Sequence, residues 1–534
     1  MAGDRDASVT PAGPREIELK LAVAPDAMAR LEALPWLHTR TEAPLRTLRL
    51  RSIYFDTADL DLARRQVTLR IRRQGRSRVQ TLKSEAAPGS PVADRAEWEV
   101  AVTGDEPDLA AFGDDRTTAL LALAPTAMLR PLFETRIRRR VLRLRWPAPS
   151  GGDARIEVAF DHGEVVAAGR REPVDEVELE LLDGPAEALL ELAAALRGVV
   201  PLRLSGVAKA ARGYRLAAGA PLRHRKAGKL RLAPGMTVDE AMRQVFRHCL
   251  AHALANEAAA AEGRNPDAVH QLRVALRRFR SALAVFAAAL PPPQRARWTE
   301  EARWLLRALG GCRDLDVLLA DLLPAASGIG GEAAPRAGLQ DLAAHCRGAA
   351  ADAVAATLAS QRAGDFFLDL ALWTQRGGWH EPAAAETAEV LSRPIEIHAM
   401  AVLERRFRRL RKAGKGFAGL DAAGRHKVRI QAKKLRYGLE FFGGALSRPA
   451  VKRHRRALTR LLERLGRRND IATARRLIGE LLREVADPVA RAELAGAGGE
   501  VVGWHAHAAM TMEADTRRAW DAVKALDPRR LFGG

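Results

Sequence analysis

Aromatic residues, cysteines and long apolar runs are all scarce in this sequence, and each shortage excludes something. Aromatic side chains make up 5% of the 534 residues, so there is little on which the bases of single-stranded nucleic acid could stack. The three cysteines have no metal-ligand spacing, which predicts a reducing compartment and no structural disulfides. No apolar run reaches about 18 residues, so we expect no membrane-spanning helix.

Targeting and phosphate-loop signatures are missing too. Residues 1–14 are polar and have no apolar core, so they do not resemble a signal peptide, and we expect a disordered segment in a cytoplasmic protein. The glycine-rich pattern GxxxxGK[ST] does not occur, so any recognition of phosphate must use side chains rather than a backbone loop.

Positive charge is in excess, and it lies in one half of the chain. There are 86 Lys and Arg against 65 Asp and Glu, a net charge of +21. Residues 1–220 hold 33 basic and 32 acidic residues, which leaves 53 against 33 for residues 221–534. A field of this sign attracts nucleic acid, inorganic polyphosphate or an acidic lipid surface. The low aromatic content favours a partner made of phosphate without bases.

The N-terminal half alternates charged and apolar residues in seven or eight short segments. In REIELKL, Glu16, Glu18 and Lys20 share one face of a strand, and Leu19 lies on the other. Similar alternation recurs in VTLRIRR, RAEWEV, TRIRRRVLRLRW and DEVELEL. With few helical segments between them, these strands predict an antiparallel sheet closed into a barrel.

The charged face of such a barrel could point to solvent or into a wet lumen. Carboxylates collect on some strands and Arg or Lys on others. This mixture favours the lumen, because Mg²⁺ is commonly held by one or two carboxylates together with substrate phosphates.

From about residue 237 the hydrophobic period becomes helical, and this half contains an internal duplication. VHQLRVALRRFR at 269–280 is matched by RHKVRIQAKKLR at 425–436. A Gly and an Asp follow 40 and 44 residues after His270, and the same pair follows His426 at the same offsets. Two such spans predict a duplicated all-α unit.

Each copy carries a basic stripe on one face of a helix. Offsets 0, +3, +7 and +10 from the histidine fall within roughly 80° of one another. Like charges at this spacing repel, so we interpret the stripe as an anion-binding surface rather than a solvated face. With the adjacent +8 position, the basic stripe is His270, Arg273, Arg277, Arg278, Arg280, His426, Arg429, Lys433, Lys434 and Arg436. The histidines are interpreted as phosphate contacts, since neighbouring cations oppose a metal; a core histidine is the alternative.

The N-terminal half resembles the CYTH family, the triphosphate tunnel metalloenzymes. The resemblance rests on EIELK (16–20), YFDT (54–57), LRIR (69–72), EWE (97–99), TRIR (135–138), EVELE (176–180) and SGVAKAARGY (205–214), in that order. It spans residues 14–216 and implies an eight-stranded tunnel that binds a triphosphate together with Mg²⁺ or Mn²⁺.

The same resemblance implies roles for individual residues. The implied metal ligands are Glu16, Glu18, Asp161, Glu176 and Glu178. The implied substrate contacts are Lys20, Arg70, Arg72, Arg136, Arg138 and Lys209. Lys83, Glu97 and Glu99 are the catalytic candidates, and either glutamate or a second metal ion could activate water.

The helical half resembles the CHAD domain, named for its histidines in an α-helical domain. The resemblance rests on the two basic helices and on CRDLDV at 312–317 with its second copy, and it spans about residues 235–525. It implies binding of inorganic polyphosphate along the basic stripe.

Together these patterns predict an α+β multidomain protein. We expect a tunnel domain at 15–216, a basic linker at 217–234 and an all-α domain at 235–526, with copies at about 235–380 and 390–526. The predicted function is metal-dependent hydrolysis of inorganic triphosphate with a polyphosphate-binding module. Such a module would allow association with polyphosphate granules in the cytoplasm. The alternatives are a non-catalytic polyphosphate-binding protein, a nucleic-acid binder, and adenylate cyclase or thiamine triphosphatase activity.

Overall fold

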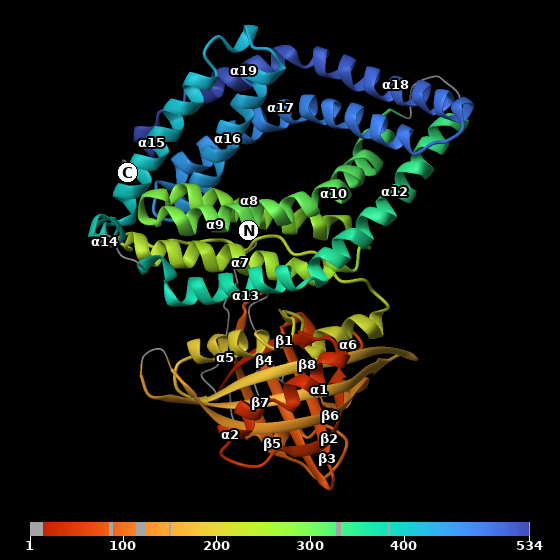
Figure 1. The fold of residues 1–534 in the computed structure, drawn as a ribbon, viewed down its shortest axis with the longest axis vertical. Coiled ribbons are helices and arrows are strands. Elements are labelled where there is room, and N and C mark those ends of the chain that lie inside the picture. The colour runs from red at the N-terminus through yellow and green to blue at the C-terminus, as the bar shows by residue number, and fades with distance from the viewer. Residues whose placement is uncertain are drawn as a thin grey trace. The chain divides into compact units, whose positions relative to one another are not determined.

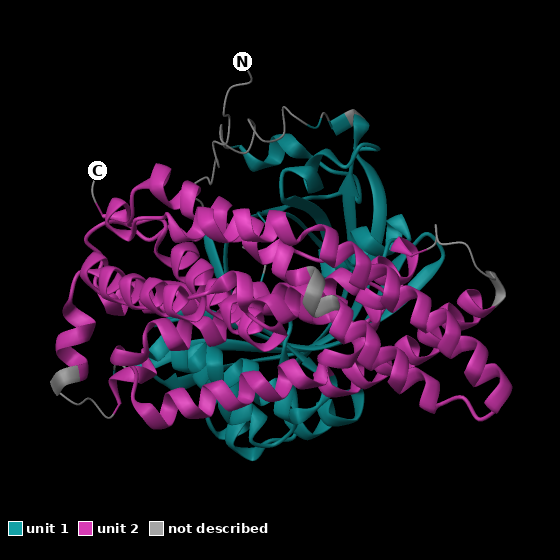
Figure 2. Cartoon of the chain, turned by 90° about the horizontal axis from the view of Figure 1, so that it is seen from above, with its two compact units in different colours: residues 1–223, 359–376 teal, residues 224–358, 377–534 magenta. Residues whose placement is uncertain are grey.

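The chain forms two compact units, residues 1–223 with 359–376 and residues 224–358 with 377–534 (Figure 2). The computed structural model describes residues 14–84, 89–113, 124, 126–148, 151–326, 333–381 and 385–532, without the side chains of 127, 333–334, 385–386 and 467–470. The predicted disordered segment therefore lies outside the described residues except for Pro14.

The first unit is a closed antiparallel barrel, as predicted. Its strands follow the order β5-β4-β3-β2-β6-β7-β8-β1-β9, and β5 also pairs with β1, which closes eight strands into a ring (Figure 1). The strands are β1 (Arg15–Val23), β2 (Arg46–Asp56), β3 (Val67–Gln74), β4 (Ser77–Ser84), β5 (Val92–Ala101), β6 (Arg130–Pro147), β7 (Asp153–Ala167), β8 (Arg170–Asp183) and the short β9 (Leu202–Leu204).

The barrel buries apolar residues on its outer face. Leu19 and Leu21 in β1 and Val177 and Leu179 in β8 are fully buried, and α5 (Glu187–Arg197) packs against β1, β6 and β8. The residues that alternate with them point inward. Because a slip of one residue would exchange the two faces, burial on the outside fixes which charged residues reach the lumen.

Helix α6 (Lys209–Ala218) packs its apolar residues into one end of the barrel. Its Leu216 joins a buried cluster with Tyr54 and Phe133, and the rings of Tyr54 and Phe133 stack at 4.5 Å. A Cβ on Gly213 would lie 2.1 Å from the Phe133 ring, so only glycine allows this approach. It places Lys209, the first residue of α6, beside the lumen. The remaining short helices are α1 (Pro25–Glu32), α2 (Pro35–Thr39) and α3 (Asp61–Arg64).

The second unit is all-α and duplicated, which also agrees with the prediction. The first copy contains α7 (Val238–Ala261), α8 (Pro266–Val285), α9 (Pro292–Ala308), α10 (Gly310–Val317), α11 (Leu323–Ala325) and α12 (Ala333–Ala359). The second contains α14 (Ala385–Ser392), α15 (Ile395–Ala413), α16 (Ala422–Phe442), α17 (Arg448–Arg483), α18 (Pro488–Thr511) and α19 (Glu513–Lys524). None of the described helices is both long and apolar enough to cross a bilayer.

Helix α13 (Gln361–Arg376) departs from the predicted division of the chain. The sequence places it in the helical domain, but it groups with the barrel and packs against α5 and β9. Arg197 of α5 pairs with Asp369 at 2.5 Å and with Asp365 at 3.4 Å.

Candidate functional site

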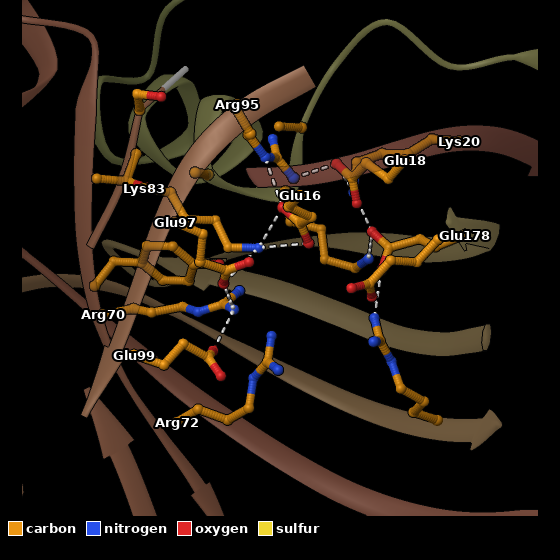
Figure 3. A pocket seen from close by; sticks show the side chains of 18 of the residues that line it. Glu16, Glu18, Lys20, Arg70, Arg72, Lys83, Arg95, Glu97, Glu99 and Glu178 are labelled. Atoms are coloured by element: carbon orange, nitrogen blue, oxygen red, sulfur yellow. Dashed lines mark hydrogen bonds and ion pairs between the residues drawn. The ribbon is translucent and has the colours of Figure 1, made fainter. Parts of the chain in front are cut away.

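Side chains from all eight barrel strands, charged on every strand except β2, meet in a lumen cavity of about 260 Å³ (Figure 3). The cavity is lined by Glu16, Glu18, Lys20, Tyr54, Thr68, Arg70, Arg72, Lys83, Ser84, Arg95, Glu97, Glu99, Arg139, Glu157, Glu178, Glu180, Ala208, Lys209 and Ala210. The strand periodicity thus brings together most of the residues selected from the sequence, although they come from widely separated segments.

Three of the candidate metal ligands form a buried carboxylate cluster. Asp161, Glu176 and Glu178 each offer an oxygen, and these oxygens lie within 4.8 Å of one another. Asp161 and Glu176 face each other across β7 and β8, and they are 0% and 3% exposed. Three convergent carboxylates in a buried site suit a hard divalent cation.

Lysine and arginine side chains compensate the carboxylate cluster. Lys209 contacts Asp161 at 2.7 Å and also pairs with Glu176 and Glu178. Arg139 donates two hydrogen bonds of 2.7 Å to the carboxylate of Asp161. Burial opposes ionisation, but Lys209 and Arg139 hold the pKa of Asp161 below its ordinary value. The carboxylate of Asp161 therefore stays charged and can bind a cation.

A second set of ion pairs lies on β1, β4 and β5. The ammonium of Lys83 contacts Glu16 at 2.8 Å and Glu97 at 2.9 Å. Arg95 bridges Glu16, at 2.8 Å, and Glu18. Burial and the charge of Arg70 lower the pKa of Lys83, and burial raises the pKa of Glu97 despite Lys83. The two shifts bring the pKa values of Lys83 and Glu97 closer together than those of an ordinary lysine and glutamate.

Two arginines of β3 have hydrogen-bond donors without an acceptor among the described residues. Arg70 lies 3.6 Å from Glu97 and 3.9 Å from Glu99. The Nε atoms of both Arg70 and Arg72 are buried without an acceptor among the described residues. Burial, Arg70 and Arg139 lower the pKa of Arg72 to about 10. A buried donor left unpaired is costly, so these guanidinium groups fit an anionic ligand in the lumen.

Two predicted substrate contacts are misplaced. Arg136 and Arg138 are exposed and lie on the outer wall of β6, whereas Arg139 faces the lumen. Because the run RIRRR has arginines at consecutive positions, its sequence does not show which of them face the lumen. The inner face of the strand includes the apolar residues Phe133 and Ile137, which pack beneath α6. Alternation counted from the charged residues alone therefore selects the wrong face.

The lumen also contains groups to which no site role was assigned from the sequence: Tyr54, Arg95, Arg139, Glu157 and Glu180. Glu180 lies opposite Glu18 and Glu157 on the neighbouring strands. Burial together with Glu16 and Glu157 raises its pKa to about 7. The alternation of EVELE predicts that it shares a face with Glu176 and Glu178, and this signal was available.

The basic stripe of the helical unit is divided between exposed and buried positions. Arg277 and His426 are exposed, while Arg273 is buried and donates to the carbonyl of Leu306 at 2.8 Å. Arg278 is 2% exposed, and its Nε lies 2.8 Å from Glu440 of α16. The prediction that Arg278 faces a polyanion is therefore wrong, because the side chain links α8 to α16.

One pair of equivalent stripe positions has the same environment in both copies. Arg280 and Arg436 both have buried Nε atoms without an acceptor in the described part of the chain. Burial, Arg313 and Arg277 lower the pKa of His270, so this histidine is neutral at pH 7 and can donate one N–H. The side chain of Asp470, the second-copy match of Asp314, lies outside the described residues.

Comparisons with known proteins agree with this division of the chain. Residues 14–214 match the CYTH domain and residues 244–479 match the CHAD domain. An inorganic triphosphatase of Haemophilus influenzae is 29% identical over 202 residues, which cover 38% of this chain and 55% of that protein. An uncharacterized protein of Mycobacterium tuberculosis is 31% identical over 286 residues, which cover 51% of this chain and 52% of that protein.

The chain thus spans about half the length of these curated relatives. Among solved structures, the CHAD domain of the plant Ricinus communis is 31% identical, with a TM-score of 0.49, over 58% of this chain and 98% of its own. The barrel with its charged lumen thus matches the CYTH domain, and the helices of residues 244–479 match the CHAD domain.

Proposed function

We propose that the barrel hydrolyses inorganic triphosphate in its lumen with the help of a divalent metal ion, and that the basic stripe binds polyphosphate. The observation that carries the first part is the juxtaposition of the carboxylate cluster with Arg70 and Arg72, whose Nε atoms have no acceptor. The triphosphatase of Haemophilus influenzae supports this choice of substrate.

The donor set fits Mg²⁺ or Mn²⁺. Asp161, Glu176 and Glu178 would hold the ion, and Glu16 and Glu18 on β1 are further carboxylates of the same lumen. Such an ion polarises phosphoryl oxygens and neutralises their charge. The ammonium of Lys209 contacts the carboxylate cluster in this structure. An ion held by the same oxygens would displace this ammonium, which could then contact the substrate phosphates.

The cations of the lumen would bind and orient the triphosphate. Arg70 and Arg72 present planar forks that match phosphate oxygens, and Lys20, Arg139 and Lys209 border the same cavity. Catalysis of this reaction depends mainly on positioning and on stabilising charge on the transferred phosphoryl group. Fixed, buried guanidinium groups supply both without reorganising.

Hydrolysis also requires a water molecule to lose a proton. Glu97 is the stronger candidate of the two predicted acceptors, because its pKa is raised and it contacts Lys83 at 2.9 Å. Glu99 accepts a hydrogen bond from Thr81 at 3.0 Å and is half exposed. Lys83 could return the proton to the leaving phosphate, which agrees with its lowered pKa.

The test measures release of phosphate from tripolyphosphate by the full chain with Mg²⁺, with Mn²⁺ or with a chelator. We expect Glu176→Gln and Arg72→Gln each to lose activity by about 10²-fold or more, the size found when one charge-stabilising group is removed. Arg171→Gln is the matched control, since Arg171 is exposed and lies on the outer face of β8, out of phase with Glu176 and Glu178. Full activity in both lumen variants would refute the proposal, and cyclic AMP formed from ATP would favour the cyclase alternative.

The second part of the proposal concerns the basic stripe. Arg277→Gln and Lys433→Gln remove charge from equivalent positions of α8 and α16, so we expect weaker binding of polyphosphate and a smaller dependence of affinity on salt. Lys427→Gln is the control, because Lys427 is exposed on α16 but outside the stripe. Equal loss in the control would mean a diffuse charge effect rather than a stripe.

A further inference from the structure

Arg136 and Arg138, which do not reach the lumen, border a separate groove of about 730 Å³ on the outer wall of the barrel. Three more arginines line it, Arg49 and Arg51 from β2 and Arg73 from β3. The barrel wall separates this outer groove from the lumen, because these side chains alternate with inward-facing residues such as Arg72 and Arg139.

The strand register places these five arginines directly opposite one another. Arg51 pairs with Arg73 on one side and with Arg136 on the other, and Arg49 pairs with Arg138. Like charges at directly opposed positions destabilise a sheet. A cluster of this kind is expected where a negatively charged ligand offsets the repulsion.

Carboxylates compensate only part of the cluster. Glu134 accepts hydrogen bonds from Arg51 at 2.7 Å and from Arg136 at 2.6 Å. Arg49 and Arg138 are exposed, and no described carboxylate lies within 4.0 Å of either of them. Their guanidinium groups are directed to solvent side by side on neighbouring strands.

The spacing and the lining point to the class of ligand. Neighbouring strands lie about 4.8 Å apart and alternate residues of one strand about 7 Å apart, so the arginines extend over a length that a single phosphate cannot span. The residues that line the groove include no Phe, Tyr or Trp on which a base could stack, and the imidazole of His162 is paired with Asp175 at 2.6 Å. Guanidinium forks suit successive phosphate groups.

We propose that the outer groove is a binding site for an inorganic polyphosphate chain, distinct from both the lumen and the basic stripe. The choice of polyphosphate as the ligand rests on the proposed function, in which this protein binds polyphosphate. The site itself rests on the five arginines and their register.

The test removes the basic stripe first, so that the outer groove is measured alone. In the full chain carrying Arg277→Gln, Arg429→Gln and Lys433→Gln, we measure binding of long-chain polyphosphate over a range of salt concentrations. Adding Arg49→Gln and Arg138→Gln should weaken the remaining binding at least tenfold and reduce the slope of log affinity against log salt by about two, one for each lost phosphate contact.

The matched control adds Arg143→Gln and Arg145→Gln instead. These arginines are exposed on the same strand but are paired with Glu157 and Glu42, so binding should be unchanged. The inference is overturned if the stripe-neutralised chain binds no polyphosphate, if the Arg49 and Arg138 changes have no greater effect than the control, or if single-stranded DNA of equal charge displaces the polyphosphate. Hydrolysis of tripolyphosphate in the lumen reports separately on the proposed function.

Discussion

Arg138 and Arg139 are neighbours in sequence but lie on opposite faces of β6, and this contrast gives a sharp prediction. We compare Arg139→Met with Arg138→Met, two changes of identical chemistry. In the first, Asp161 loses its two hydrogen bonds of 2.7 Å while remaining fully buried. In the second, an exposed side chain without a carboxylate partner among the described residues is removed.

The expected magnitudes differ strongly. Removing one partner of a buried ion pair costs about 3–5 kcal/mol, because the other charge stays buried. At about 2–4 °C per kcal/mol for a unit of this size, Arg139→Met should lower the melting temperature of the barrel by roughly 6–20 °C. A surface change such as Arg138→Met should stay within about 0.5 kcal/mol.

The assay is calorimetric unfolding of the full chain in chelator, with tripolyphosphate hydrolysis measured in parallel. Arg139→Met should also lose hydrolysis, since Arg139 borders the cavity, whereas Arg138→Met should retain it. Equal destabilisation by the two changes, or a larger effect of Arg138→Met, would refute the strand register and the lumen built on it.

Three further predictions concern packing, pH and metal. Gly213→Ala should destabilise the barrel by about 1–3 kcal/mol and raise the KM for triphosphate, because its Cβ would clash with Phe133; calorimetry and kinetics measure the two effects. Burial and a nearby arginine lower the pKa of His252 to about 4 in the folded protein. Below pH 6.5 the unfolded chain therefore binds a proton that the folded protein does not, and the free energy of unfolding should fall by at most about 3 kcal/mol as the pH approaches 4. His252→Gln should reduce this loss in acid unfolding titrations, and the exposed His507 should not when changed likewise. Mg²⁺ or Mn²⁺ at about 100 times its dissociation constant should stabilise the barrel by about 2.7 kcal/mol, measured as a rise in melting temperature, and Glu176→Gln should abolish the rise.

Where charged and aliphatic residues alternate strictly along a strand, the sequence was enough to predict which side chains face the lumen. In β1, β3 and β8, charged residues occupy one face and aliphatic residues the other, so Glu18, Arg70 and Glu178 were placed correctly. In β6 the charges occupy consecutive positions, and the face is decided by what packs on the strand from elsewhere. The packing of α6 on Phe133 is a long-range contact that the local pattern does not contain.

The helical half shows the same limit. Offsets along α8 group the basic residues on one face of the helix, but they cannot tell which of these residues another helix will cover. Arg278 is buried because α16 supplies Glu440 at 2.8 Å and the ring of Phe441 at 5.8 Å. Both residues are more than 150 positions away in the sequence. A helical period predicts a face, and only the packing of neighbouring helices decides which part of it remains accessible.

Helix α13 comes from the C-terminal half of the sequence but belongs to the barrel unit, and a glycine lets it approach β9. A Cβ at Gly364 would lie 2.4 Å from the carbonyl oxygen of Leu202 in β9. Glycine at this position allows α13 to approach the edge of the sheet, which a large side chain would prevent. Residues 359–376 therefore form part of the structure that supports the tunnel, through the contacts of α13 with α5 and β9.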